Sequence, residues 1–191
     1  MTARTHDLAA ITALGIITIS SFKIQVTLGT ALTALLANQL GGIAPDIDQP
    51  TAPFWRNLPV GQFIGKIIDK MLGGHRFISH SLLGMVGFGF LAKLILTFLH
   101  PVVPHLNIGV VWWAFMIGLA SHLVMDTFTK EGVPWLLPIP IKFGLPPIKK
   151  FRITTGKWVE KVLFILILVF DIWYLSAHYI KLLALIHHQI I

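Results

Sequence analysis

Long runs of apolar residues alternate with polar stretches along most of the chain. Five runs stand out, over residues 8–22, 24–44, 82–99, 108–125 and 162–186. A helix needs about 20 mostly apolar residues to cross a bilayer, and the last three runs reach or approach that length. The first run is short and the second carries Gln, Thr and Asn, so these two form either spans or a buried, tilted hairpin. The pattern predicts an all-α integral membrane bundle of about five apolar helices.

A further helix is predicted in the loop between the second and third runs. Apolar residues such as Phe63, Ile67 and Met71 recur there at helical spacing, with Lys66 and Lys70 on the opposite side. This pattern is typical of an amphipathic helix that lies on a membrane surface. The loop between the fourth and fifth runs is rich in proline, which excludes a continuous helix there.

The composition agrees with a membrane protein. Hydrophobic residues make up 55% of the 191 residues and charged residues 12%, and the mean hydropathy is +0.78, whereas soluble domains average about 25% charged residues. No Ser-, Gly- or Pro-rich linker divides the chain, so we expect a single domain over residues 1–191. No small-residue cleavage site follows the first run cleanly, which favours a retained helix over a signal peptide.

The formal charge of +7 comes from basic residues that flank the apolar runs. Lys and Arg concentrate in the loops before the third and fifth runs, and the loop at 100–107 has none. Basic loops favour the cytoplasmic side of a membrane. We therefore expect a multi-pass protein of the inner (plasma) membrane with its N-terminus and both basic loops in the cytoplasm. The expected partner of these charges is the lipid bilayer, and no nucleic acid is expected.

The same alternation of helices gathers ionisable residues at the cytoplasmic face. Each predicted helix brings at least one of them to its cytoplasmic end. They are His6 and Asp7, Asp46 and Asp48, His75, Arg76 and His80, His122 and Asp126, and Glu160. The other five histidines, His100, His105, His178, His187 and His188, fall elsewhere and are interpreted as interfacial or tail residues.

His122 and Asp126 are the clearest candidate pair. They are four residues apart on a helix, so their side chains share one face and could hold a divalent ion together. The alternative is a hydrogen-bonded polar pair, although ionisable residues in membrane helices are costly and usually functional. His6, His75, His80 and one of the two aspartates Asp46 and Asp48 complete the candidate metal ligands.

The chain has no cysteine, so a metal must bind imidazole and carboxylate. Those ligands suit zinc, manganese or iron. We expect one or two divalent ions, with zinc favoured and manganese as the alternative.

The roles of four other residues remain open at this point. Arg76 either binds a phosphate oxygen or is a basic flank of the third run. Asp48 is a candidate general base as well as a ligand, and Ser79 is a candidate N-cap of the third helix. Asp171 lies inside the fifth run, where we expect a structural pairing with Lys93 or with a polar residue of the second run.

Several motifs in fixed order resemble the YdjM-like family of inner-membrane-associated, metal-dependent hydrolases. They are Met1 to Asp7, Gly42-x-x-Pro45-Asp46-Ile47-Asp48, His75-Arg76-x-x-Ser79-His80-Ser81, Ser121-His122-x-x-x-Asp126-x-x-Thr129-x-x-Gly132 and Arg152-x-Thr154-x-Gly156-x-x-x-Glu160. The motif order is similar to that of the all-helical zinc-dependent phospholipase C and nuclease superfamily.

The resemblance implies a metal-activated water that attacks a phosphoester. Only one His-x-x-x-Asp pair is present and no clear His-x-x-x-Glu pair follows it, so Glu160 is the late acidic candidate and one or two ions fit better than three. One family member is described as binding the LexA repressor, which would be a non-enzymatic role.

Two functions are therefore carried forward. The first is a membrane-bound, metal-dependent hydrolase acting on a phosphoester, with a phospholipid among the candidate substrates. The second is a non-catalytic membrane protein that recruits a cytoplasmic regulatory partner. A metal transporter is less favoured, because the ligands lie at one face rather than near the membrane midplane.

Overall fold

The computed structural model describes residues 1–20, 26–139 and 141–187. The described chain is all-helical and contains no strand, which confirms the all-α prediction. Its elements are α1 (Ala3–Ser20), α2 (Leu28–Ile43), η1 (Ala44–Asp48), α3 (Pro53–Arg56), α4 (Gly61–Met71), α5 (Leu82–Leu99), α6 (Ile108–Thr127), η2 (Lys149–Phe151), α7 (Trp158–Ala177) and α8 (Tyr179–His187).

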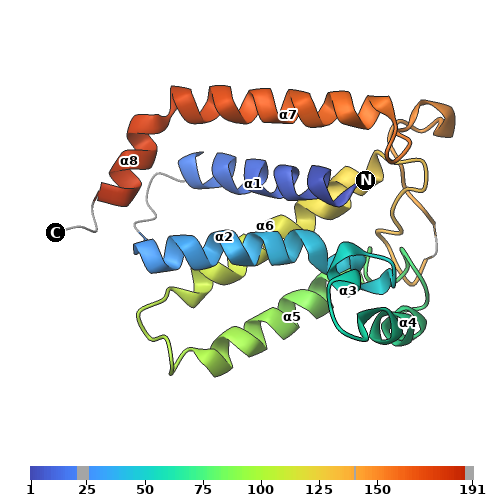
Figure 1. Cartoon of the computed structure of the whole chain (residues 1–191), viewed down its shortest axis with the longest axis horizontal. Coiled ribbons are helices and arrows are strands. Elements are labelled where there is room, and N and C mark those ends of the chain that lie inside the picture. Colours follow the sequence, from blue (N-terminus) through green and yellow to red (C-terminus); the bar gives the residue numbers. More distant parts are fainter. Residues whose placement is uncertain (21–25, 140, 188–191) are drawn as a thin grey trace.

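Helix α6 is the centre of the bundle and packs against α1, α2 and α5, while α7 packs on α1. Successive long helices run in alternating directions, so one end of the bundle collects the starts of α1, α5 and α7 and the ends of α2 and α6 (Figure 1). The short helices α3 and α4 and the long loop after α6 lie at that same end (Figure 1). The predicted gathering of helix ends is therefore a feature of the fold.

The predicted helix boundaries hold best where capping residues define them. Helix α5 spans the predicted 82–99, and α6 extends two residues beyond the predicted 108–125. The prediction of one helix over 162–186 was wrong, because α7 ends at Ala177 and α8 begins at Tyr179. The second helix starts at Leu28 rather than at residue 24, and the predicted ends of the first two runs within 21–25 lie outside the described residues.

Two of the described helices, α5 and α6, are long and apolar enough to cross a membrane. Helix α7 has the same length as α6 but carries Glu160, Lys161 and Asp171, and α2 has only 16 residues. Length and composition therefore support two of the five predicted spans.

The exposed surface of these helices is strongly apolar. Along α5, Val86, Phe90, Leu94 and Phe98 follow one another at four-residue spacing and are 57–82% exposed. An apolar stripe of this kind needs a non-aqueous neighbour. Helix α4 also exposes apolar side chains, including Phe63, Ile67 and Met71, as expected for an amphipathic surface helix.

Close contact between α2 and α6 depends on glycines. A Cβ atom at Gly118 would lie 2.0 Å from the carbonyl oxygen of Asn38, and one at Gly41 would lie 2.0 Å from that of Phe115. Small residues at a helix crossing allow such close approach of two backbones. The crossing is also bridged by Asn38 Nδ2, which donates to the carbonyl of Ala114 at 3.1 Å. As a result, the end of α2 lies directly against the polar face of α6.

Candidate metal centre

All seven predicted metal ligands lie in one cluster at the gathered helix ends. Their ligand atoms form three overlapping groups, each with all atoms within 4.8 Å of one another. The groups are His6, His122 and Asp126; Asp46, His80 and His122; and Asp46, Asp48 and His75. The shared members His122 and Asp46 join the three groups into one continuous site.

Four ligand atoms define the middle of the cluster. His80 Nε2 lies 3.7 Å from Asp46 Oδ1 and 3.6 Å from Asp126 Oδ2. His122 Nε2 lies 3.7 Å from each of the same two oxygens. Both imidazole nitrogens are buried and have no hydrogen-bond partner among the described residues. Two imidazoles and two carboxylates thus converge on one small space.

The outer nitrogens of these imidazoles are held by neighbouring groups. His122 Nδ1 donates to the carbonyl of Gly42 at 2.6 Å, across the close α2–α6 contact. His80 Nδ1 lies 2.9 Å from Ser79 Oγ. The ring of His6 stacks on that of His122 with 3.7 Å between centroids. Because such contacts fix the orientation of each ring, the Nε2 atoms of His80 and His122 point into the cluster.

Asp48 is completely buried and both of its oxygens are engaged. Oδ1 lies 2.7 Å from His75 Nδ1, while Oδ2 accepts hydrogen bonds from the Arg76 amide at 2.9 Å and from the Ser79 hydroxyl. The structure therefore gives Asp48 the position of a group that orients the 75–80 turn. Asp46 lies two residues earlier in η1, and its carboxylate makes none of these three contacts.

The prediction of Ser79 as the N-cap of α5 was wrong. The cap is Ser81, whose hydroxyl accepts a hydrogen bond from the Gly84 amide at 3.0 Å.

Arg76 reaches the centre of the cluster from a left-handed backbone conformation, with φ at 60°. Its Nη2 lies 2.5 Å from Asp126 Oδ2, and its Nη1 donates to Thr129 Oγ1 at 2.8 Å. The guanidinium is 7% exposed, so it is far more enclosed than a basic flank of a membrane helix.

Glu160 is buried but belongs to none of the three ligand groups. Its carboxylate accepts hydrogen bonds from the Thr2 amide at 2.5 Å, the Thr5 hydroxyl at 2.8 Å and the Gly156 amide at 2.6 Å. Burial favours a raised pKa for Glu160, but these hydrogen bonds outweigh it and lower the pKa. The carboxylate anchors the start of α1, which carries His6, to the start of α7.

Asp171 pairs with Thr12 of α1, whose hydroxyl lies 2.9 Å from its Oδ2. The prediction of Lys93 or a residue of the second helix as its partner was wrong. Its structural role, joining α7 to α1, agrees with the expectation.

The electrostatics of the cluster depend on mutual contacts. Burial favours a raised pKa for Asp48, but hydrogen bonds with His75 and His80 hold its pKa well below the usual range. Burial favours a lowered pKa for His80, yet contacts with Asp126 and Asp48 raise it overall. The pKa of Asp7 is raised, mainly by burial and also by the nearby Asp46. The cluster therefore favours positive charge at its centre.

A pocket of about 220 Å³ adjoins the cluster. His6, Asp7 and Asp46 line it together with Phe54 and Asn57 of the α3 region. It therefore adjoins the ligand groups through His6 and Asp46.

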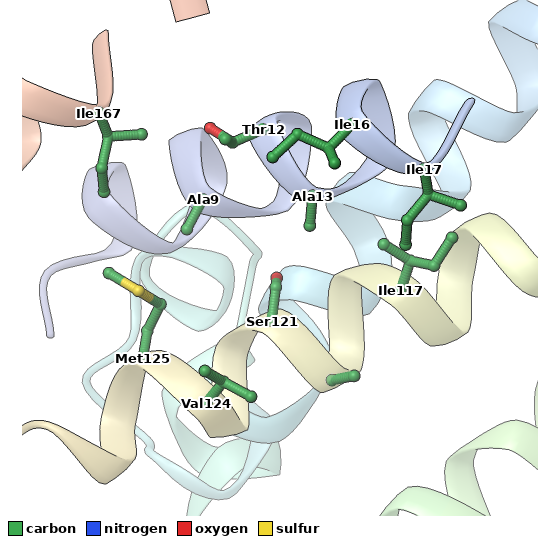
Figure 2. Close-up of a pocket in the computed structure, with 11 residues that line it drawn as sticks. Ala9, Thr12, Ala13, Ile16, Ile17, Ile117, Ser121, Val124, Met125 and Ile167 are labelled. Carbon is green, nitrogen blue, oxygen red and sulfur yellow. The ribbon is translucent and has the colours of Figure 1, made fainter. Parts of the chain in front are cut away.

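A second, apolar groove of about 420 Å³ runs between α1 and α6 and includes Ile167 of α7. In Figure 2, Ala13 and Ile17 of α1 face Ser121 and Ile117 of α6 across this groove. The hydroxyl of Ser121 donates to the Gly118 carbonyl of its own helix. None of its lining side chains is titratable, so the groove is separate from the His/Asp cluster.

Several contributors to the site could not be selected from the sequence. Thr129, Thr2 and Thr5 contact Arg76 or Glu160, and Gly42 contributes only its carbonyl oxygen. All four residues do fall within the family-like motifs, which is the one signal that pointed toward them.

The fold and cluster together define a class: helical membrane proteins with a buried His/Asp site at one end of the bundle. Within that class the chain belongs to the YdjM family, because the family model described as YdjM inner membrane protein matches residues 1–185. This confirms the family resemblance and, at that level, association with the inner membrane and its lipid.

Two curated relatives are similar to the chain. The uncharacterized protein YvsG of Bacillus subtilis is 31% identical over 123 residues, which cover 64% of this chain and 66% of YvsG. The inner membrane protein YdjM of Escherichia coli is 28% identical over 138 residues, covering 69% of this chain and 61% of YdjM. The chain thus spans at most about two thirds of the length of these relatives. No solved structure matches it.

Proposed function

We propose that this chain is a metal-dependent phosphoester hydrolase of the inner membrane, with a divalent metal, favoured as zinc, held by the His/Asp cluster. The observation that carries the proposal is the convergence of His80 Nε2, His122 Nε2, Asp46 Oδ1 and Asp126 Oδ2, with 3.6–3.7 Å between neighbouring N and O atoms. Tetrahedral zinc with bonds of about 2.0–2.2 Å separates its ligand atoms by about 3.3–3.6 Å. The four nitrogen-to-oxygen separations are within a few tenths of an ångström of that spacing, and His80, His122 and Asp46 together form one of the three ligand groups.

The ligand groups support one or two ions. His122 Nδ1 is occupied by the Gly42 carbonyl, so His122 offers only Nε2 and cannot serve two ions. His6 and Asp126 extend the cluster on one side, and His75 extends it on the other. A bound divalent ion supplies hydroxide near neutral pH by lowering the pKa of a coordinated water.

The chain's own residues supply the remaining functions. Arg76 places a buried guanidinium beside Asp126, where it can contact phosphoryl oxygens by the paired donors that this group offers. Asp48 keeps the 75–80 turn and its two imidazoles in place, and is proposed as a positioning residue rather than a ligand. Glu160 is proposed to hold the start of α1, and thereby His6, in register.

Metal analysis of the purified protein in detergent tests the site. Wild type is compared with His122→Ala, Asp126→Asn and the control His105→Ala, which lies on the connection between α5 and α6. We expect stoichiometric zinc or manganese in wild type and control, and a loss in both cluster variants. Equal metal content in all four proteins would refute the metal site.

A second measurement uses wild type alone, so its result does not depend on whether the variants fold. A ligand that binds only the folded state at 100 times its Kd stabilises it by about 2.7 kcal/mol, so added zinc should raise the thermal midpoint.

The reaction class needs a separate assay. Metal-loaded protein is screened with a generic phosphodiester and with phospholipids in mixed micelles. Turnover that disappears in Arg76→Lys supports hydrolysis. Retention of metal without any turnover would favour the alternative, recruitment of a cytoplasmic regulatory partner.

A further inference from the structure

We infer that the pocket beside the cluster binds a primary ammonium group that is joined to the phosphoester, as in a phosphoethanolamine headgroup. This inference rests on the proposed function and deepens it by naming the substrate class. Asp7 is the proposed specificity residue.

The lining of the pocket favours a cation. Asp7 and Asp46 both contribute carboxylates, and none of the lining side chains is Lys or Arg. An isolated phosphate would meet two like charges here, so the anionic part of a substrate belongs with the metal ligands and Arg76. The part that occupies the pocket must then be neutral or positive.

One oxygen of the half-buried Asp7 carboxylate lacks a hydrogen bond within the described chain. Its Oδ1 is buried and has no partner among the described residues. His6 lines the same pocket, is 2% exposed and also has an unpartnered Nδ1. Buried polar atoms are normally satisfied, so these two atoms indicate that a polar ligand enters the pocket.

The missing partner of Asp7 is a donor. A carboxylate oxygen accepts hydrogen bonds, and a primary ammonium donates up to three, whereas a quaternary ammonium donates none. Asn57 is also a lining residue, and its side-chain amide has an oxygen that can act as a second acceptor. The pocket therefore discriminates phosphoethanolamine from phosphocholine, although both carry a positive charge.

The position of the pocket suits a headgroup. One wall is formed by the α3 region, where Phe54 and Leu58 are exposed, and the apolar face of α4 follows directly. An interfacial segment of this kind lies at headgroup depth. A soluble ester has the same recognition chemistry, so the experiment must separate the two sources.

The test uses zinc-loaded full-length protein in detergent and isothermal titration calorimetry. The probes are phosphoethanolamine, phosphocholine and inorganic phosphate. We expect wild type to bind phosphoethanolamine about 10–100-fold more tightly than the other two, the range for a charged hydrogen bond. Asp7→Asn should lose this preference and keep its phosphate affinity, and Asp7→Glu should retain it. Asp69→Asn on α4 is the matched control and should behave as wild type.

Mixed micelles then identify the source of the headgroup. Competition by phosphatidylethanolamine, and not by phosphatidylcholine, indicates a lipid substrate, whereas competition by neither indicates a free ester. Equal affinity for the three probes, no binding of any probe to zinc-loaded protein, or a preference that survives in Asp7→Asn would overturn the inference and leave the metal site intact. Failure of wild type to hold zinc would instead overturn the proposed function.

Discussion

Gly118 on α6 is where packing and the proposed metal centre can be tested together. In Gly118→Ala the new Cβ would lie 2.0 Å from the Asn38 carbonyl oxygen and 2.9 Å from the Gly42 amide nitrogen, whereas ordinary contact begins at 3.4 Å. Relief of the shorter contact requires α2 and α6 to separate by about 1.4 Å. The hydrogen bond from His122 Nδ1 to Gly42, now 2.6 Å long, would then exceed the limit for such a bond.

The same separation moves the end of α2, and with it Asp46, away from His122 and His80. Loss of the contacts that orient metal ligands typically lowers metal affinity about 10–100-fold, and we expect a loss in that range for zinc. The assay is competition with a fluorescent zinc chelator in detergent, with helix content checked by circular dichroism. The control is Gly87→Ala on α5, where an added Cβ meets nothing within 4 Å. Unchanged zinc affinity in a helical Gly118→Ala protein would refute the reasoning.

Four further predictions concern protons and supporting carboxylates. In metal-free protein, the raised pKa of His80 stabilises the fold below the unfolded value of 6.5, and this contribution is lost as pH rises through the folded pKa. The difference in thermal midpoint between wild type and His80→Gln should therefore shrink from pH 6 to 8, and a constant difference would contradict this. The lowered pKa of Asp48 stabilises the fold above 3.8 and is lost as pH falls below it, so the midpoint should also fall under acid conditions. Zinc affinity should drop more in Asp46→Asn than in Asp48→Asn, and the reverse order would show that Asp48 is the ligand. Glu160→Gln should destabilise the protein by about 1–3 kcal/mol in thermal unfolding, whereas lost turnover with unchanged stability would identify Glu160 as catalytic.

Much of the fold could be predicted because helix ends carry local signals. Helix α5 begins after a serine cap and follows an unbroken apolar run, so its limits agree with the prediction. The break between α7 and α8 at His178 has no such signal, since apolar residues continue on both sides of it. The prediction of five spans depended on apolar length alone. Among the described helices, only α5 and α6 are both long and apolar enough to cross a membrane, since α7 carries three charged residues and α2 is short.

The site was predictable as a set of residues but not as a set of roles. Alternating helices bring the seven ligand candidates to one end, and this follows from topology. The difference between Asp46 and Asp48 depends on the turn of η1, which directs one carboxylate to the cluster and the other to the His75–Ser79 turn. Apart from the Gly156 amide, the partners of Glu160 are the Thr2 amide and the Thr2 and Thr5 hydroxyls, which are far away in sequence and which no local pattern reveals.

The cluster is hard to explain as part of the stability of the fold. Three of its candidate ligand atoms, His6 Nε2, His80 Nε2 and His122 Nε2, are buried without a hydrogen bond among the described residues. Each such atom costs about 1–3 kcal/mol, against a total stability of about 5–15 kcal/mol for a typical domain. Apolar residues at these positions would avoid that cost. A cation bound between the ligand atoms would satisfy them together, which is the physical reason for favouring a metal centre over a structural polar network.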